Sequence, residues 1–358
     1  MTNHSFTVAE QRSQRLLEDL VTNPHHHRVL TGDRPTGPLH IGHEFGSIAN
    51  RVLLQNLGVE SFIVIADYQV LTDRRDVADI PNNIANLVLD YLSLGLDPFN
   101  HRTFIFTHSQ IPELHQLVIP FSMVVTVSEL KRNPTIKDEI QASGIRSPSV
   151  GMFTYPISQA ADILFCKSTV VPVGKDQLPH LELTRKIAAR CNEWFDESIF
   201  PEPTALLSTS PLLLGLDGRQ KMSKSRDNAI FLTMSADEVE AAIKKAKTDS
   251  DREIVNDPVS RPEVSNLLLL FSLCSGIQIG EVEAKFRSKG YSELKRCLTD
   301  VVNSHLEPIR ARRAQFAKTK GIVNEVLTKG TREARQRAEE TLEDVRRAMR
   351  MSMQYFEL

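Results

Sequence analysis

Residues 28–43 read RVLTGDRPTGPLHIGH, and this stretch decides the fold of the first half of the chain. Residues 29–31 form a short apolar run that predicts a buried strand, and the loop after them is rich in glycine and proline. A helix is expected from about Gly42 to Asn56. A strand, a glycine-containing loop and a helix in this order are typical of nucleotide sites, because the strand end and the N–H groups of the helix face the same ligand.

The alternation of strands and helices continues along the chain. Apolar, β-branched and aromatic runs predict further strands at residues 61–66, 103–106 and 169–173. Helical spacing of apolar residues is found at residues 76–94, from about Pro112 onward, and at 154–165. This order predicts an α/β protein with a Rossmann-like, doubly wound parallel sheet.

The strand signal fades after Asn228, and residues 235–358 show helical spacing. We therefore expect three parts: an N-terminal extension at 1–26 that holds one amphipathic helix, a nucleotide-binding catalytic domain at 27–230, and a C-terminal α-helical domain at 231–358. Three adjacent histidines at 25–27 are expected in a solvated loop, because adjacent side chains diverge and do not meet at one metal ion.

Composition sets few limits on function. The formal net charge of −2 neither demands nor excludes nucleic acid. Residues 310–350 carry 12 Lys or Arg against 6 Asp or Glu, which fits either a solvated helix face or a surface for phosphate. Four cysteines without C-x-x-C spacing predict neither a zinc site nor disulfides and fit the cytoplasm. No secretory signal or membrane span is expected.

Two histidines in the first loop are candidates for phosphate chemistry. His40 and His43 flank Ile41-Gly42 at the expected start of the helix, where neutral or charged imidazoles could stabilise developing phosphate charge. The alternative is an ordinary loop with two incidental histidines.

A second loop carries two lysines. Lys221-Met222-Ser223-Lys224-Ser225 follows a glycine-containing turn, so Lys221 and Lys224 could clamp a triphosphate as it gains charge in the transition state. A charged surface turn is the alternative, and it would be the default interpretation of a single K-x-x-K pattern.

The pair of motifs, HIGH followed by KMSKS, resembles the signature pair of class I aminoacyl-tRNA synthetases. Three further stretches resemble the tryptophanyl-tRNA synthetases: GMFTYPISQAADIL at 151–164, VPVGKDQLPHLELTR at 171–185, and RPEVSNLL at 261–268. The similarity covers about residues 28 to 350. It implies activation of tryptophan with ATP and Mg²⁺, no structural metal, tRNA(Trp) as partner, anticodon reading by the helical domain, and a homodimer.

The resemblance also implies which residues touch the ligands. Tyr155, Gln159 and Asp162 share one helix face by their spacing, and Asp162 would accept the indole N–H of tryptophan, with Gln69 nearby. Without the resemblance this face could be an ordinary polar helix side. Contacts to ATP are implied for Arg34, Pro35, Thr36, Gly42, His43, Gly174, Lys175, Asp176, Leu212, Lys221, Met222, Ser223, Lys224 and Ser225.

The chain departs from the family pattern at several positions. Histidines occupy both ends of HIGH where many relatives have Thr and Asn, and Gln69 and Gln159 stand where His and Met are common. These departures resemble a divergent, auxiliary-type branch. The alternatives are a tyrosyl-tRNA synthetase, since Tyr-x-x-x-Gln-x-x-Asp also occurs there, a nucleotide- or RNA-binding paralogue that charges no tRNA, and a small-molecule nucleotidylyltransferase. The VGKDQ stretch at 173–177 favours tryptophan over tyrosine.

Overall fold

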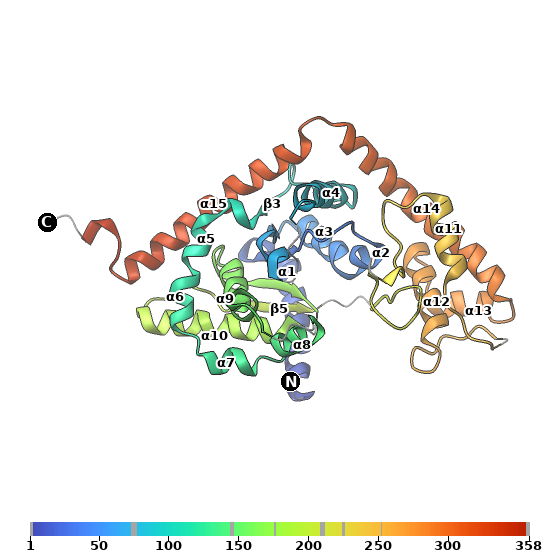
Figure 1. Cartoon of the computed structure of the whole chain (residues 1–358), viewed down its shortest axis with the longest axis horizontal. Helices are drawn as coiled ribbons and strands as arrows, with labels where there is room; N and C mark the ends of the chain where they lie inside the picture. Colours follow the sequence, from blue (N-terminus) through green and yellow to red (C-terminus); the bar gives the residue numbers. More distant parts are fainter. Residues whose placement is uncertain are drawn as a thin grey trace.

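A five-stranded parallel sheet forms the centre of the protein. The computed structural model (Figure 1) describes residues 3–72, 77–143, 147–174, 177–207, 212–223, 226–251 and 253–355. The strands are β1 (Arg28–Asp33), β2 (Glu60–Ile65), β3 (Thr103–Thr107), β4 (Val170–Val173) and β5 (Thr204–Leu207), in the order β3-β2-β1-β4-β5. This order places the topological switch point between β1 and β4, where ligands bind in open parallel sheets. The predicted Rossmann-like fold is confirmed.

Four of the strands lie where the sequence predicts them, and β5 was not predicted. Every residue of β2 and β3 is buried, as expected for strands covered on both faces. Side chains alternate between two cores: Ile63 and Ile105 belong to one, Phe62 and Phe104 to the other. The sheet thus separates two apolar layers of helices.

Helices connect the strands and cover both faces. The predicted helix at 42–56 is present as three consecutive pieces, α2 (Ile41–His43), a π-helical turn η2 (Glu44–Ile48) and α3 (Ala49–Asn56). The other connecting helices are α4 (Ile80–Ser93), α5 (Pro112–Gln116), α6 (Val118–Met123), α7 (Val127–Arg132), α8 (Pro134–Ser143), α9 (Val150–Leu164) and α10 (Leu178–Phe195). Short 3-10 turns are η1 (Pro24–His26), η3 (Tyr68–Thr72), η4 (His108–Gln110) and η7 (Met353–Tyr355).

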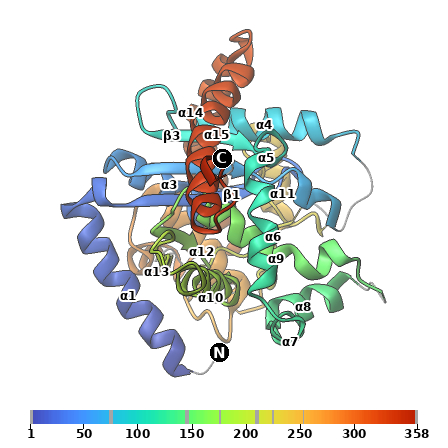
Figure 2. The same cartoon turned by 90° about the vertical axis from the view of Figure 1, so that its left-hand side faces the viewer.

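The N-terminal extension is part of the folded structure. Its helix α1 (Asn3–Thr22) contains the predicted amphipathic segment and packs against β5. Leu16 and Leu20 are buried in a small core with Leu206, and the Leu207 N–H donates to Ser13 Oγ at 2.8 Å. The helix, seen at one side of the molecule in Figure 2, therefore covers the edge strand, which would otherwise expose unpaired backbone groups.

The C-terminal region is helical, as predicted. It consists of α11 (Ala236–Lys245), α12 (Pro262–Ser275), α13 (Ile279–Phe286), α14 (Tyr291–Lys318) and α15 (Ile322–Ala348). Figure 1 shows α14 and α15 as two long arms, and the turn between them spans residues 319–321. The last helix returns to the sheet and packs along β3, with Ala334 and Ala338 in the same core as Phe104. The division near residue 230 stays a prediction.

No single helix within the described ranges is both long enough and apolar enough to cross a membrane. The pair α12 and α13 would qualify by length and composition only when taken together, and the two helices are bent by 118° relative to each other.

Gly330 lies where α15 approaches the sheet very closely. A Cβ atom built on Gly330 would lie 1.9 Å from the carbonyl oxygen of Ile105 in β3, far inside van der Waals contact. Backbone on both sides makes this contact, so a side-chain rotation cannot relieve it. Glycine is therefore required wherever the helix axis comes this near to the strand.

Replacing Gly330 with Ala should destabilise the protein by more than about 2 kcal/mol, because α15 must move away from β3. The measurement is the free energy of unfolding from a urea titration. Gly280→Ala in α13 is the matched control, since its Cβ would meet nothing within 4 Å. We expect that control to be neutral or stabilising by up to about 1 kcal/mol. Equal stabilities for the two variants would contradict the close approach.

Candidate functional site

Two neighbouring cavities open at the carboxyl end of the sheet. The first, here called the α9 cavity, has a volume of about 540 Å³ and lies between β1, β4 and α9. The second, here called the loop cavity, has a volume of about 860 Å³ and lies along the loop after β1. Both are lined by Gly32, Asp33 and Arg34, so one ligand could extend from one cavity into the other. This is the ligand-binding edge expected for the fold.

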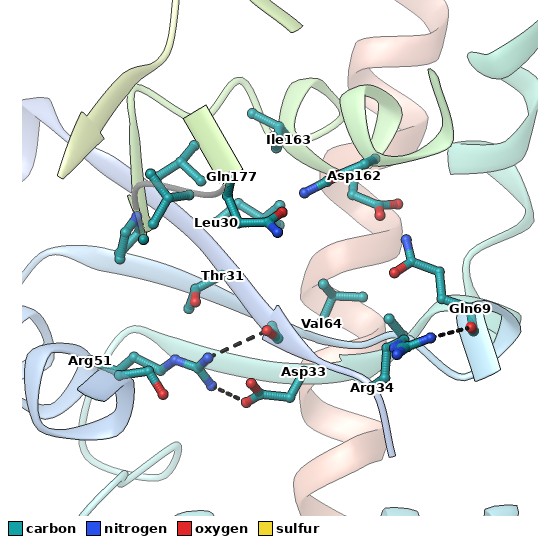
Figure 3. A pocket seen from close by; sticks show the side chains of 18 of the residues that line it. Leu30, Thr31, Asp33, Arg34, Arg51, Val64, Gln69, Asp162, Ile163 and Gln177 are labelled. Carbon is teal, nitrogen blue, oxygen red and sulfur yellow. Dashed lines mark hydrogen bonds and ion pairs between the residues drawn. The ribbon is translucent and has the colours of Figure 1, made fainter. Parts of the chain in front are cut away.

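The end of β1 is fixed by a buried cluster of charge. Arg51 from α3 contacts Asp33 Oδ2 at 2.6 Å (Figure 3). The Tyr91 hydroxyl from α4 donates to the same carboxylate. The Arg51 side chain is 4% exposed. Burial alone would raise the pKa of Asp33, but Arg51 and Tyr91 outweigh it and lower that pKa. Asp33 therefore remains a carboxylate that anchors the strand end from which the loop departs.

The loop residues 34–43, here called the first signature loop, run along the loop cavity. Arg34, Pro35 and Thr36 line this cavity together with His40 and His43. The two imidazole rings stack with centroids 3.6 Å apart, and the His40 N–H donates to His43 Nδ1 at 3.2 Å. The fold thus brings together His40 and His43, the two histidines that the sequence analysis selected.

Both histidines are held in the neutral form. Burial, together with the neighbouring His43, lowers the pKa of His40 to about 3. Burial also lowers the pKa of His43. Of the two possibilities left open by the sequence, the geometry thus favours neutral imidazoles near pH 7. They can donate hydrogen bonds to a phosphate, but they bring no positive charge.

Backbone hydrogen bonds tie the two signature motifs together. The Ile41 N–H donates to the Ile230 carbonyl at 2.9 Å, and the Leu232 N–H donates to the Leu39 carbonyl at 3.1 Å. The segment around Ile230 follows directly on the KMSKS motif, residues 221–225. Met222 and Ser223 from that motif consequently line the loop cavity beside His40. Side chains from the two motifs can therefore act on the same ligand.

Two buried asparagines hold the chain just before and within the KMSKS motif by hydrogen bonds. Asn228 donates from Nδ2 to Asp217 Oδ2 at 3.0 Å and accepts the Ser223 N–H at 2.8 Å. Asn266 from α12 accepts the Leu214 N–H at 2.8 Å and donates back to the Leu214 carbonyl at 3.1 Å. The sequence analysis assigned no role to either amide. Each satisfies backbone groups on a segment without regular secondary structure.

The predicted polar face of α9 borders the α9 cavity. Tyr155, Gln159 and Asp162 all line it, and Gln69 reaches it from η3. Figure 3 shows the Asp162 carboxylate and the Gln69 side chain pointing toward one another, with Arg34 bonded to the Gln69 carbonyl. The face is therefore directed at a cavity and not at solvent, which was the alternative for this residue pattern.

Two histidines that the sequence analysis did not assign support this face from behind. His108 Nε2 lies 2.7 Å from Asp162 Oδ1, and both side chains are buried. His180 Nε2 lies 2.8 Å from the Tyr155 hydroxyl. His108 follows β3 and His180 lies in α10, so only the folded structure places them against α9. Burial and the nearby Glu139 raise the pKa of Tyr155, which keeps its hydroxyl protonated.

The remaining predicted residues fall into two groups. Gly174 lines the α9 cavity, but Gly42, Leu212 and Lys221 line neither cavity, and the Leu212 side chain is exposed. Gly42 instead packs against the His40 ring. The second group, Lys175, Asp176, Lys224 and Ser225, lies outside the described residues. Contacts from all of these residues to ATP stay predictions.

Two contacts connect the C-terminal helix α14 to the first signature loop, through Asp90 of α4, and to the π-helical turn after the loop. Arg313 Nε contacts Asp90 Oδ1 at 2.6 Å, and Asp90 Oδ2 accepts the Leu39 N–H at 3.2 Å, next to His40. His305 Nε2 lies 2.7 Å from Glu44 Oε1 in the π-helical turn. Asp90 is completely buried, and burial raises its pKa although Arg313 opposes the shift. The helical region thus helps to hold the loop that borders the site.

Metal ligands do not gather anywhere in the parts of the chain that the structure describes. No group of three or more His, Cys, Asp or Glu side chains there is arranged to hold an ion.

Comparison with known proteins identifies the class. Residues 22–307 match the family described as tRNA synthetases class I (W and Y), the letters standing for tryptophan and tyrosine. The chain belongs to this family. Its fold and the two signature motifs at the sheet edge agree with that membership.

Individual relatives are similar along almost their whole length. A tryptophan–tRNA ligase of Streptococcus mutans is 42% identical over 332 residues, which cover 90% of this chain and 97% of the relative. The corresponding enzyme of Clostridium longisporum is 40% identical over 336 residues, covering 92% and 97%. The structure of Campylobacter jejuni tryptophanyl-tRNA synthetase complexed with ADP and tryptophan is 32% identical, with a TM-score of 0.78, covering 90% of this chain and 99% of that one.

The Arg313–Asp90 pair gives a prediction with a definite pH dependence. The pKa of Asp90 is higher in the folded protein than in the unfolded chain, so the folded protein binds this proton more tightly. The free energy of unfolding therefore falls as the pH rises above the usual carboxyl range. Arg313→Met removes the opposing guanidinium and enlarges this loss. We expect the variant to lose about 3 kcal/mol of unfolding free energy at pH 8 and clearly less at pH 5.

Arg312→Met is the matched control, because Arg312 donates to the Ser93 carbonyl and has no carboxylate in this contact. Its loss should be about 1 kcal/mol and the same at both pH values. Chemical denaturation at pH 5 and pH 8 measures both variants. A pH-independent loss in Arg313→Met would show that the Asp90 carboxylate is not the partner that matters.

Proposed function

We propose that this protein ligates L-tryptophan to tRNA(Trp) through a tryptophanyl-adenylate. The observation that carries the proposal is the α9 face: Asp162 and Tyr155 border a cavity that adjoins the loop cavity with both signature motifs. A carboxylate at the wall of a partly apolar cavity can accept the indole N–H and leave the ring to dispersion contacts. Ligands that lack this N–H would leave the carboxylate without its donor, which is costly.

In the first step, an oxygen of the tryptophan carboxylate attacks the α-phosphorus of ATP. The bond from that phosphorus to the bridging oxygen of pyrophosphate breaks, and pyrophosphate leaves with the electron pair. The carboxylate is already a nucleophile, so the protein needs no general base. Its contribution is alignment and stabilisation of charge.

Named residues divide this work. The neutral rings of His40 and His43 donate hydrogen bonds to the phosphates, and Lys221 and Lys224 supply positive charge to the leaving pyrophosphate. Mg²⁺ arrives as the ATP complex and adds charge of its own. Arg34, Pro35 and Thr36 border the loop cavity along which the nucleotide would lie.

In the second step, the 2′-hydroxyl of the terminal tRNA ribose attacks the acyl carbon and AMP leaves. The C-terminal helices would bind the tRNA. Basic side chains on α15 such as Arg332 and Arg346 are exposed, and they also make contacts within the protein. A homodimer is proposed as well, and it has support in exposed apolar side chains of α6, Ile119 and Met123. The cytoplasm, which holds tRNA and keeps cysteines reduced, is the proposed compartment.

The function is tested by pyrophosphate exchange into ATP with each of the twenty amino acids. We expect exchange with tryptophan alone. Exchange with tyrosine instead would establish the tyrosyl alternative, and absence of exchange with every amino acid, in protein that binds ATP, would favour a paralogue without charging activity.

Asp162→Ala should lower kcat/KM for tryptophan by roughly ten- to hundredfold, since a hydrogen bond to a charged group contributes about 1.5–3 kcal/mol. The KM for ATP should change little, because Asp162 lines the α9 cavity and not the loop cavity. Steady-state exchange kinetics measure both constants. Unchanged selectivity for tryptophan over phenylalanine and tyrosine would contradict the assignment of Asp162.

Lys224→Ala should lower kcat for adenylate formation while the KM for tryptophan stays near that of the parent. The lysine is proposed to act on charge that develops only in the transition state. Pre-steady-state adenylate formation is the appropriate readout. A defect confined to the KM for ATP would assign Lys224 to binding of ground-state nucleotide.

A further inference from the structure

The buried pair of His108 and Asp162 lies directly behind the wall of the α9 cavity. His108 Nε2 and Asp162 Oδ1 are 2.7 Å apart, and the two side chains are 4% and 5% exposed. Asp162 lines the cavity, whereas His108 is absent from its lining. His108 can therefore influence a ligand in this cavity through Asp162 and not by touching the ligand.

The backbone around His108 is held by a second carboxylate. Asp67, which follows β2, accepts the Ser109 N–H at 3.1 Å through Oδ1 and the Ser109 hydroxyl through Oδ2. The Ile111 N–H closes the turn by donating to the His108 carbonyl at 3.0 Å. Three elements, β2, β3 and α9, thus fix the position of one imidazole relative to the cavity.

The negative charge of Asp162 needs a partner when tryptophan is bound beside it. A buried carboxylate is costly without a partner, and an indole N–H is a neutral donor that cannot balance it. A protonated His108 makes the pair neutral. Its contact with Oδ1 also leaves Oδ2 as the oxygen for a ligand on the cavity side.

His108 has surroundings that favour its charged form. Burial lowers the pKa of the imidazole, but Asp162 and Asp67 outweigh burial, and the pKa of His108 is raised overall. His115 on α5 is the other titratable group beside it, with ring centroids 6.1 Å apart. Burial and His108 lower the pKa of His115, so His108 takes up a proton more readily than His115 does.

We propose that His108 is a positioning residue for amino-acid selection: it neutralises Asp162 and directs one oxygen of that carboxylate at the indole N–H of tryptophan. The inference rests on the proposed role of Asp162 in tryptophan recognition. It adds a specificity determinant supplied by the loop after β3, outside the α9 face itself.

The test isolates the contribution of the indole N–H to recognition of the amino acid. Kinetics of pyrophosphate exchange are compared for tryptophan and for β-(3-benzothienyl)alanine, in which sulfur replaces the indole N–H. The ratio of the two kcat/KM values is determined for the parent, for Asp162→Ala, for His108→Gln and for the matched control His115→Gln. Since Gln can donate a neutral hydrogen bond, His108→Gln removes the charge and keeps a donor.

We expect Asp162→Ala to abolish most of the discrimination and His108→Gln to lower it by at least about threefold. His115→Gln should keep the ratio of the parent, and the KM for ATP should stay unchanged in both histidine variants. A general loss of packing would raise the KM for ATP as well. If Asp162→Ala loses discrimination and His108→Gln does not, His108 has no role in selection and the inference is overturned.

If Asp162→Ala also retains the discrimination, the proposed contact of Asp162 fails, and the inference falls with it. A second measurement needs no variant and guards against misfolding. Nuclear magnetic resonance of ¹⁵N-labelled imidazoles in the intact protein should show His108 protonated at pH 7 and His115 neutral. A neutral His108 at pH 7 would overturn the proposed charge balance.

Discussion

The active site depends on where the first strand ends. Asp33, the last residue of β1, is fixed by the buried side chains of Arg51 and Tyr91. One residue earlier, Gly32 lies so close to β2 that a Cβ would be 2.1 Å from the Val64 carbonyl. The chain therefore leaves the sheet at one defined point and in one direction. Both cavities share this point, so displacement of the strand end would change the first signature loop and the α9 cavity together.

Buried charged side chains connect the site to segments that are distant in the sequence. Asp90 links the first signature loop to α14, and Glu44 makes a second link to the same helix through His305. His108 supports Asp162 in the same manner on the other side of the sheet. Such pairs contribute little net stability compared with apolar packing, but they are costly to break singly. They therefore specify one arrangement of loop, helix and sheet, and through them the C-terminal helix α14 helps to hold the loop that borders the site.

The sequence alone predicted those features that depend on a local pattern of residues. Buried runs revealed β2 and β3, and helical spacing placed Tyr155, Gln159 and Asp162 on one face. The short strand β5 has only four residues, and its pairing with β4 and cover by α1 are tertiary effects without a local pattern. The partners His108 and Arg313 could not be found, because each pairing joins segments far apart in the chain; Arg313 and Asp90 are separated by 223 positions.

A crystal structure of the protein with a non-hydrolysable sulfamoyl analogue of tryptophanyl-adenylate is the most direct test of this account. The account predicts the indole in the α9 cavity, with its nitrogen about 3 Å from a carboxylate oxygen of Asp162. It also predicts the sulfamoyl group in the loop cavity, facing His40 and His43. An indole nitrogen more than about 4 Å from Asp162, or a nucleotide bound away from the first signature loop, would contradict it.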